Sequence, residues 1–205
     1  MKFRLFAQER AGLEILSTMA RGLGPAVLTL SEMLAAPAAD HAALAERLHT
    51  HEAETASLQV SLMTQMRSSF INPLPREDLF TLSRYLTDAM EKLDGAGELI
   101  LIYRLERTSR RASELLDIIA RQTEITAEVV RTLDDLDEAE DYWIETLRLA
   151  KRADHTHRVY VGELLADHKP ASYAKHRDLA DALKGVTTDM RRLATTVGSI
   201  IVKEA

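Results

Sequence analysis

Six stretches of the chain repeat apolar side chains every three or four residues, and this periodicity constrains the fold more than any other feature. It is the period of an α-helix that buries one face. The stretches cover residues 13–34, 44–66, 79–100, 115–133, 143–165 and 179–200. We therefore expect six long helices, each with one apolar face.

Proline-containing or polar segments separate these stretches. Asp40 is the expected N-cap of the second helix and Ser109 that of the fourth, while Pro170 divides the last two. Long helices with short connections usually lie antiparallel. The sequence thus predicts an all-α fold of six long antiparallel helices.

The predicted helices fall into two sets of three along the chain. We expect two three-helix halves, at about residues 8–104 and 109–203, packed together in a single domain that covers residues 1–205. An internal repeat is consistent with this division.

Composition narrows the class of protein. The chain has 205 residues, of which 46% are hydrophobic, and only eight glycines and five prolines, which favours helix over a turn-rich β fold. A net charge of -6 argues against nucleic-acid binding. No stretch reaches the roughly 20 apolar residues of a membrane span, and there is no cysteine, so we expect a cytoplasmic protein.

No known catalytic motif is present: the chain has no glycine-rich phosphate loop, no His-Glu-x-x-His and no nucleophile elbow. We therefore predict that it is not an enzyme and has no cofactor. Carboxylates on helices remain, because Glu91, Asp94 and Glu98 share one flank of the third helix and Glu52 flanks the second. Such carboxylates either chelate a divalent cation or form a solvated acidic surface.

Asp154 is a second candidate, because it falls within the apolar stripe of the fifth helix, with His157 one turn later. A carboxylate that faces a core requires a partner. Three partners are open at this point: His157, an arginine of a neighbouring helix, or a metal ion shared with the imidazole.

Several segments resemble the PhoU-like family of phosphate transport regulators, whose members often accompany inorganic phosphate transporters of the Pit type. The resemblance covers nearly the whole chain and is most specific in the turn and the ending. Its segments are Phe-Ile-x-Pro-x-x-Arg-Glu-Asp at 70–78, Leu-x-Asp at 86–88, Tyr-Trp-Ile-Glu at 142–145, Ala-Asp-x-x-His-Arg at 153–158 and Val-Lys-Glu at 202–204.

The resemblance implies a family motif of two acidic residues four apart that holds metal clusters on the helices. The corresponding pairs here are all incomplete: Glu52 with Ala56, Thr87 with Glu91, Ala150 with Asp154, and Lys184 with Thr188. We expect no strongly bound metal. A weak divalent site would use Glu52 and Glu91, with Asp154 and His157 as the second candidate.

The resemblance also implies a function. It predicts a non-catalytic cytoplasmic accessory or regulatory protein that docks on a Pit-type phosphate permease, in peripheral contact with the inner face of the membrane. The basic and apolar residues 2–6 are a candidate docking arm, or else pack on the bundle. The alternatives are a ferritin-like metal-binding bundle and a helical scaffold, and homo-oligomerisation is left open.

Overall fold

The protein is all-α over the residues that the structure, a computed structural model, describes: 3–69, 72, 74–133 and 139–204. This part of the chain contains six long α-helices and no strand, which confirms the predicted fold class. The helices are α1 (Phe3–Ala35), α2 (His41–Ser68), α3 (Arg76–Tyr103), α4 (Arg110–Arg131), α5 (Ala139–Asp167) and α6 (Pro170–Glu204), with a 3-10 turn at Ala38–Asp40.

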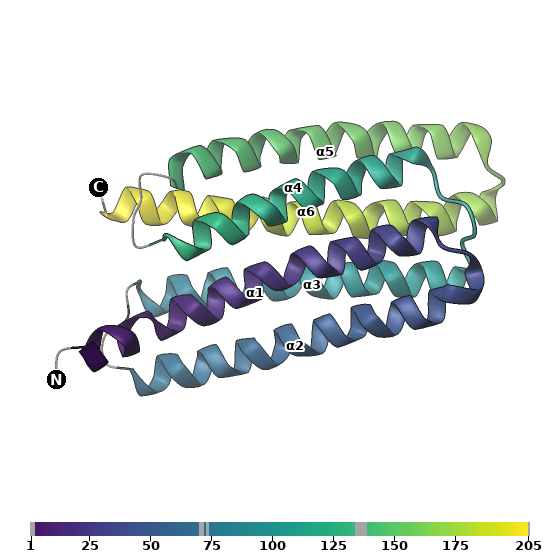
Figure 1. Ribbon diagram of the computed structural model, residues 1–205. Coiled ribbons are helices and arrows are strands. Elements are labelled where there is room, and N and C mark those ends of the chain that lie inside the picture. The colour runs from purple at the N-terminus through teal and green to yellow at the C-terminus, as the bar shows by residue number, and fades with distance from the viewer. Residues whose placement is uncertain (1–2, 70–71, 73, 134–138, 205) are drawn as a thin grey trace.

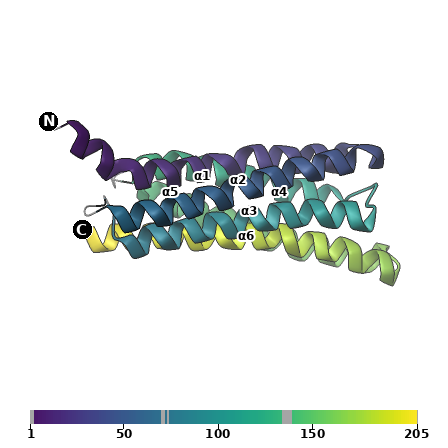
Figure 2. The ribbon, with the colours of Figure 1, turned by 90° about the horizontal axis from the view of Figure 1, so that it is seen from below.

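Successive helices run in opposite directions along one long axis (Figures 1 and 2). Helices α1, α2 and α3 pack against one another, and so do α4, α5 and α6. The two sets meet through α3 against α6 and α1 against α4. Because the number of helices is even, α1 starts at the end of the bundle where α6 finishes (Figure 1).

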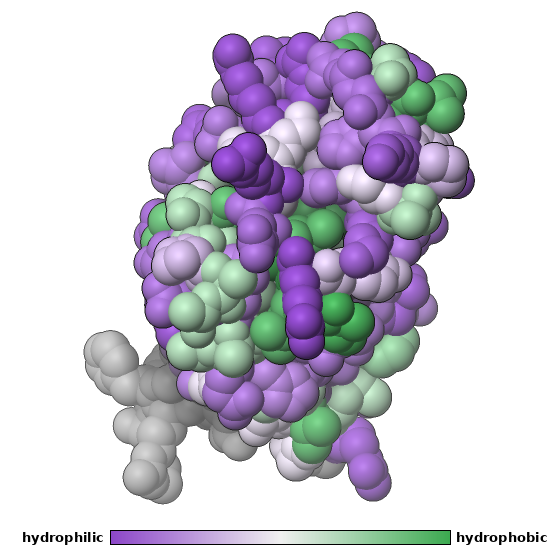
Figure 3. All heavy atoms as spheres, turned by 90° about the vertical axis from the view of Figure 1, so that its right-hand side faces the viewer, coloured by the Kyte–Doolittle hydropathy of each residue, from purple (hydrophilic) through white to green (hydrophobic). Residues whose placement is uncertain are grey.

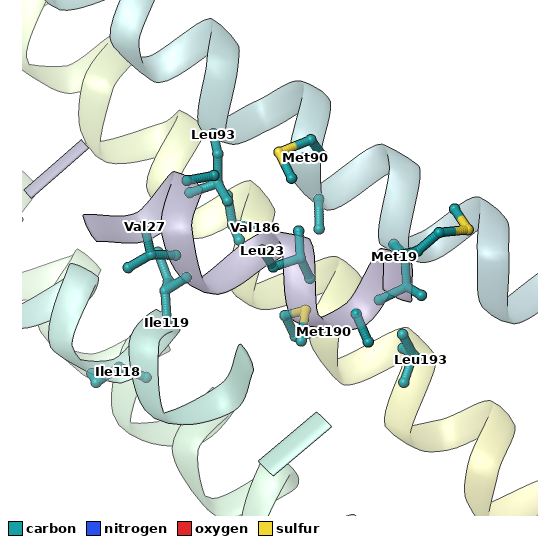
Figure 4. Packing of buried hydrophobic residues seen from close by; sticks show 14 of the residues in the cluster. Met19, Leu23, Val27, Met90, Leu93, Ile118, Ile119, Val186, Met190 and Leu193 are labelled. Atoms are coloured by element: carbon teal, nitrogen blue, oxygen red, sulfur yellow. The ribbon is translucent and has the colours of Figure 1, made fainter. Parts of the chain in front are cut away.

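The centre of the hydrophobic core lies between the two sets, where α1, α3, α4 and α6 meet. Figure 4 shows side chains from these four helices pointing toward one another. Fully or almost fully buried side chains in this region are Met19, Leu23 and Val27 of α1, Met90 and Leu93 of α3, Ile118 and Ile119 of α4, and Val186, Met190 and Leu193 of α6.

The capping residues predicted from the sequence explain the ends of the helices only in part. Ser109 caps α4 as predicted, because its Oγ accepts a hydrogen bond from the Arg111 N–H at 3.1 Å. Asp40 precedes α2, but its side chain makes no capping hydrogen bond. Arg104 ends α3 in the left-handed conformation (φ 52°), which places its N–H and that of Leu105 on the last carbonyls of the helix.

Five of the six predicted apolar faces are the buried ones, and the face predicted for α5 is wrong. Trp143 and Leu165, expected in its core stripe, are 36% and 70% exposed. The buried face is centred one residue earlier along the helix and shares Ala150 with the predicted stripe. Its residues are Ala139, Tyr142, Thr146, Leu149, Ala150, Ala153, Thr156, Tyr160 and Leu164. Two threonines and two tyrosines on this face weaken its hydrophobic signal, so the sequence pattern pointed to the neighbouring face.

The surface combines charged side chains with scattered apolar ones. Seen from the end where α3 and α5 finish, it is mainly hydrophilic, with hydrophobic areas between the helix ends (Figure 3). Ile102 and Leu165, near these helix ends, are 69% and 70% exposed. No helix in the described residues combines the length and apolarity needed to cross a membrane. The candidate arm at residues 2–6 lies outside the described side chains.

Leu86 and Asp88 of α3 provide a test of the assigned faces. Leu86 is fully buried, whereas Asp88 is partly exposed and its carboxylate lies 3.7 Å from Arg84. We expect Leu86→Asp to lower the free energy of unfolding by more than about 3 kcal/mol, because it buries a charge without a partner. Asp88→Ala, the control, should change it by less than about 0.5 kcal/mol. Equal urea-unfolding midpoints for the two variants would contradict this arrangement.

Candidate functional site

The two most specific segments of the family resemblance meet at one end of the α3–α6 contact. Asp78, in the first turn of α3, is 6% exposed and accepts hydrogen bonds from Nζ of Lys203 at 2.9 and 3.1 Å. Lys203 lies in the last turn of α6. A carboxylate at a helix N-terminus and an ammonium at a C-terminus are each favoured by the helix dipole. The pair thus holds the end of α6 on the start of α3.

In the middle of the same contact lies a buried carboxylate. The Asp189 side chain of α6 is 1% exposed and accepts a hydrogen bond from the Lys92 ammonium of α3 and another from Arg192 Nη1 at 3.1 Å. Gly185 leaves room for the lysine, since a Cβ there would lie 2.7 Å from Lys92 Cδ. The two cations offset the cost of removing Asp189 from water.

The far end of the α3–α6 contact is joined by hydrogen bonds as well. The Tyr103 hydroxyl donates to Asp178 at 2.8 Å, and Lys175 Nζ donates to the Tyr103 carbonyl at 3.2 Å. These groups are exposed, so each bond contributes little to stability by itself. They nevertheless keep the same antiparallel alignment of α3 with α6 as the Asp78–Lys203 and Lys92–Asp189 pairs.

The structure gives Asp154 and His157 separate partners on α6. Asp154, a quarter exposed, lies 2.5 Å from Lys184 Nζ and 3.7 Å from Arg191 Nη1. His157 Nε2 is 2.7 Å from Asp181 Oδ1. Of the three partners considered for Asp154, the structure contains the arginine of a neighbouring helix, together with a lysine that the sequence did not indicate as a partner. Lys184 stands at a position where the resemblance would lead one to expect an acidic residue.

Glu52 and Glu91 lie at the same level of the antiparallel α2–α3 pair. His49 Nδ1 and Asp94 Oδ2 are 3.5 Å apart. Glu52 lies one helical turn after His49 on α2, and Glu91 lies one helical turn before Asp94 on α3, so both glutamates are at the same height along the antiparallel pair. Burial raises the pKa of Asp94, an effect that the neighbouring His49 partly opposes. Glu52 is half-buried and Glu91 is exposed. A cation site shared by the two carboxylates stays a prediction.

Within the described residues, no three or more His, Asp or Glu side chains come together in a group suited to hold a metal ion. Two carboxylates leave most of the coordination shell of a divalent cation to water, which corresponds to weak binding. The metal site at Glu52 and Glu91 remains a prediction of this kind.

The contact between α1 and α4 is built differently, with open hollows along it. One has a volume of about 730 Å³ and is lined by small and apolar side chains, including Gly24, Leu28 and Ala127, together with the charged side chains of Arg21, Asp117, Arg121 and Glu124. A second, of about 430 Å³, contains Arg21 and Arg131. Sequence reasoning missed this region, because a groove depends on how two helices pack, and small side chains alone do not predict one.

Two histidines meet at the turn between α5 and α6. The rings of His168 and His176 have their centroids 4.9 Å apart, and His168 Nδ1 lies 2.8 Å from Ser172 Oγ. His176 is 7% exposed, and its Nδ1 has no hydrogen-bond partner among the residues that the structure describes. Burial, followed by the nearby His168 and Lys175, lowers the pKa of His176.

The Lys92–Asp189 pair can be tested by a double-mutant cycle. Lys92→Met should lower the free energy of unfolding by about 1–3 kcal/mol, because Asp189 stays buried with one cation fewer. Adding Asp189→Leu should restore part of that loss, since the unpaired charge is removed. Urea unfolding monitored by circular dichroism gives all four corners of the cycle. Arg148→Met, which removes the exposed partner of Glu145, is the control and should cost less than about 1 kcal/mol. Additive losses in the double variant would show that the pair is not coupled.

The metal prediction needs two measurements. Elemental analysis of the dialysed protein should find iron, zinc and nickel well below one ion per chain. Titration with Mn²⁺ should give a dissociation constant of about 10⁻⁴–10⁻³ M, because few protein oxygens are available. Glu52→Gln/Glu91→Gln should abolish this binding, whereas the exposed control pair Glu106→Gln/Glu140→Gln should leave it unchanged. Near-stoichiometric metal after dialysis would overturn the prediction.

Comparisons with known proteins returned no match: no protein-family model fits the chain, and no curated protein is significantly similar to it. The resemblance to PhoU-like proteins is therefore carried by the quoted segments alone and remains an expectation.

Proposed function

We propose that the protein is a non-catalytic accessory protein that regulates inorganic phosphate transport by docking on a Pit-type permease at the cytoplasmic side of the membrane. The proposal follows from the resemblance to PhoU-like regulators. The all-α bundle with two packed sets of three helices is compatible with this proposal.

The contact between Asp78 and Lys203 is the observation that carries the proposal. The two residues belong to the turn and the ending, the most specific segments of the resemblance, and they lie far apart in sequence. Because α3 and α6 run antiparallel, the start of α3 and the end of α6 lie at the same end of the bundle. Their hydrogen bonds give both segments one structural role, which supports reading them as parts of one family pattern.

Other segments of the resemblance also contact α6. Asp154 and His157 pair with side chains of that helix, and the indole of Trp143 lies against Gly198, where a Cβ would come within 3.2 Å of it. Because α6 receives contacts from these segments, their residue types are explained by packing and pairing. This supports a non-catalytic protein whose function is binding.

The state of the carboxylates supports a non-catalytic role. A carboxylate that acts as a base or metal ligand has to be available to a substrate or a cation. Asp189, which is buried on α6, and Asp154, which is a quarter exposed on α5, each have two basic partners within 3.7 Å. Their charge is already neutralised by the protein, so they support the fold rather than chemistry.

Phosphate uptake in cells tests the proposal. Deletion of the gene should change the initial rate of phosphate uptake, and expression of the wild-type chain should restore it, because a regulator acts on the transporter. The permease should also co-purify with the protein from crosslinked cells. Unchanged uptake across phosphate concentrations, together with absence of the permease from the crosslinked material, would favour the scaffold interpretation instead.

A further inference from the structure

We infer that His168 and His176, at the turn between α5 and α6, together bind one Zn²⁺ ion. His168 directly follows the last residue of α5, and His176 lies in the second turn of α6. Their turn is at the right-hand end of the bundle in Figure 1. Neither histidine belongs to a segment of the family resemblance, so this inference does not depend on the proposed function.

The buried nitrogen of His176 is the observation that points to a ligand. The residue is 7% exposed, and its Nδ1 is shielded from solvent without a hydrogen-bond partner among the described residues. Such atoms are rare in folded proteins, because the cost of removing them from water is not offset by a hydrogen bond. A metal ion on this nitrogen would offset that cost, since imidazole is the commonest metal ligand among side chains.

The separation of the two rings suits chelation of one ion. Their centroids are 4.9 Å apart, and their planes meet at 55°. Zn²⁺ binds an imidazole nitrogen at about 2.0–2.1 Å, so one ion that joins two rings at a tetrahedral angle holds their centroids about 5 Å apart. The two rings therefore already have the separation of a two-histidine chelate.

Ser172 positions the ring of His168. Its Oγ lies 2.8 Å from His168 Nδ1, and it precedes His176 on α6 by one helical turn. When the Nδ1–H donates to this hydroxyl, the lone pair of His168 is on Nε2, and an outer hydrogen bond of this kind selects the metal-binding tautomer. His168 is half-buried, which gives the ion a route from solvent.

The charges next to the rings allow a cation to bind. Burial, followed by the nearby His168 and Lys175, lowers the pKa of His176, so its imidazole is neutral at pH 7. The Lys175 ammonium donates a hydrogen bond to the Tyr103 carbonyl of α3 at 3.2 Å, which fixes this charge at the end of α3. On the other side, Asp167 and Lys169 flank His168 with opposite charges.

The number of ligands determines the type of ion and its affinity. Within the described residues, no further histidine or carboxylate joins the two rings, so water completes the coordination shell. Two neutral nitrogen ligands favour Zn²⁺ over Mg²⁺ and Ca²⁺, which prefer oxygen. With only two protein ligands, the ion exchanges with solution and is removed by dialysis.

Calorimetric titration of the full chain with Zn²⁺ tests the site. It is made in the Glu52→Gln/Glu91→Gln background, which removes the predicted carboxylate site. One ion per chain should bind, and His168→Gln should weaken this binding by at least about tenfold, because one of two protein ligands is lost. His155→Gln, which removes an exposed histidine of α5, is the matched control and should leave the affinity unchanged.

Ser172→Ala tests the positioning of the ring. It keeps both imidazoles but removes the hydroxyl on His168 Nδ1, so Zn²⁺ affinity should fall by about tenfold. His168 and Ser172 carry the test because both are half-buried, whereas a change at the buried His176 also disturbs the core.

Histidine side-chain NMR identifies the ligands directly. Zn²⁺ should shift the ring nitrogen resonances of His168 and His176 and leave those of His155 in place. It should also raise the melting temperature of the parent chain more than that of His168→Gln, because an ion that binds the folded state stabilises it.

Three results would overturn the site: no binding of Zn²⁺, an affinity that His168→Gln leaves unchanged, or ring shifts confined to other histidines. Each of them would leave the two rings as a packing contact only.

Discussion

The antiparallel contact between α3 and α6 fixes how the two sets of helices fit together, and its buried charge sets the register. Apolar helix faces permit sliding by one turn at moderate cost, because most side chains would find other apolar neighbours. A buried carboxylate does not permit such sliding, because the loss of its cation leaves an uncompensated charge. Lys92 lies as many residues after Asp78 as Asp189 lies before Lys203, so the central and terminal pairs require the same register. The specificity of the fold therefore resides in a few polar contacts within a large apolar interface.

Much of this fold could be predicted from the sequence, because most of the helices bury faces rich in leucine. In α3 and α6 the predicted stripes are the buried ones along their whole length. The prediction failed on α5, which buries Thr146, Thr156 and Tyr160 while Leu165 lies in solvent. There α5 packs against α4 and α6, and its buried face combines threonines and tyrosines with small apolar side chains, which hydropathy alone does not identify as a core face.

The candidate site could be predicted less well, because the residues that pair in it lie far apart along the chain. The sequence shows that Asp154 requires a partner, but the choice of Lys184 depends on the register of α5 against α6. Asp189 was missed altogether, although it adjoins Met190 in the core stripe and precedes Arg192 by three residues, a spacing that signals local pairing. The groove between α1 and α4 has no local signal, since it arises from what two helices leave unfilled.

The paired imidazoles at the turn between α5 and α6 give the molecule a point of acid sensitivity. Because the folded environment lowers the pKa of His176, the unfolded chain binds the proton more readily, and the turn loses stability as the pH falls below about 6.5. A second positive charge beside His168 adds repulsion at the same place. The Asp78–Lys203 pair lies at the opposite end of α6 and does not involve these rings. Mild acidification therefore weakens the packing of the two rings where α5 and α6 meet.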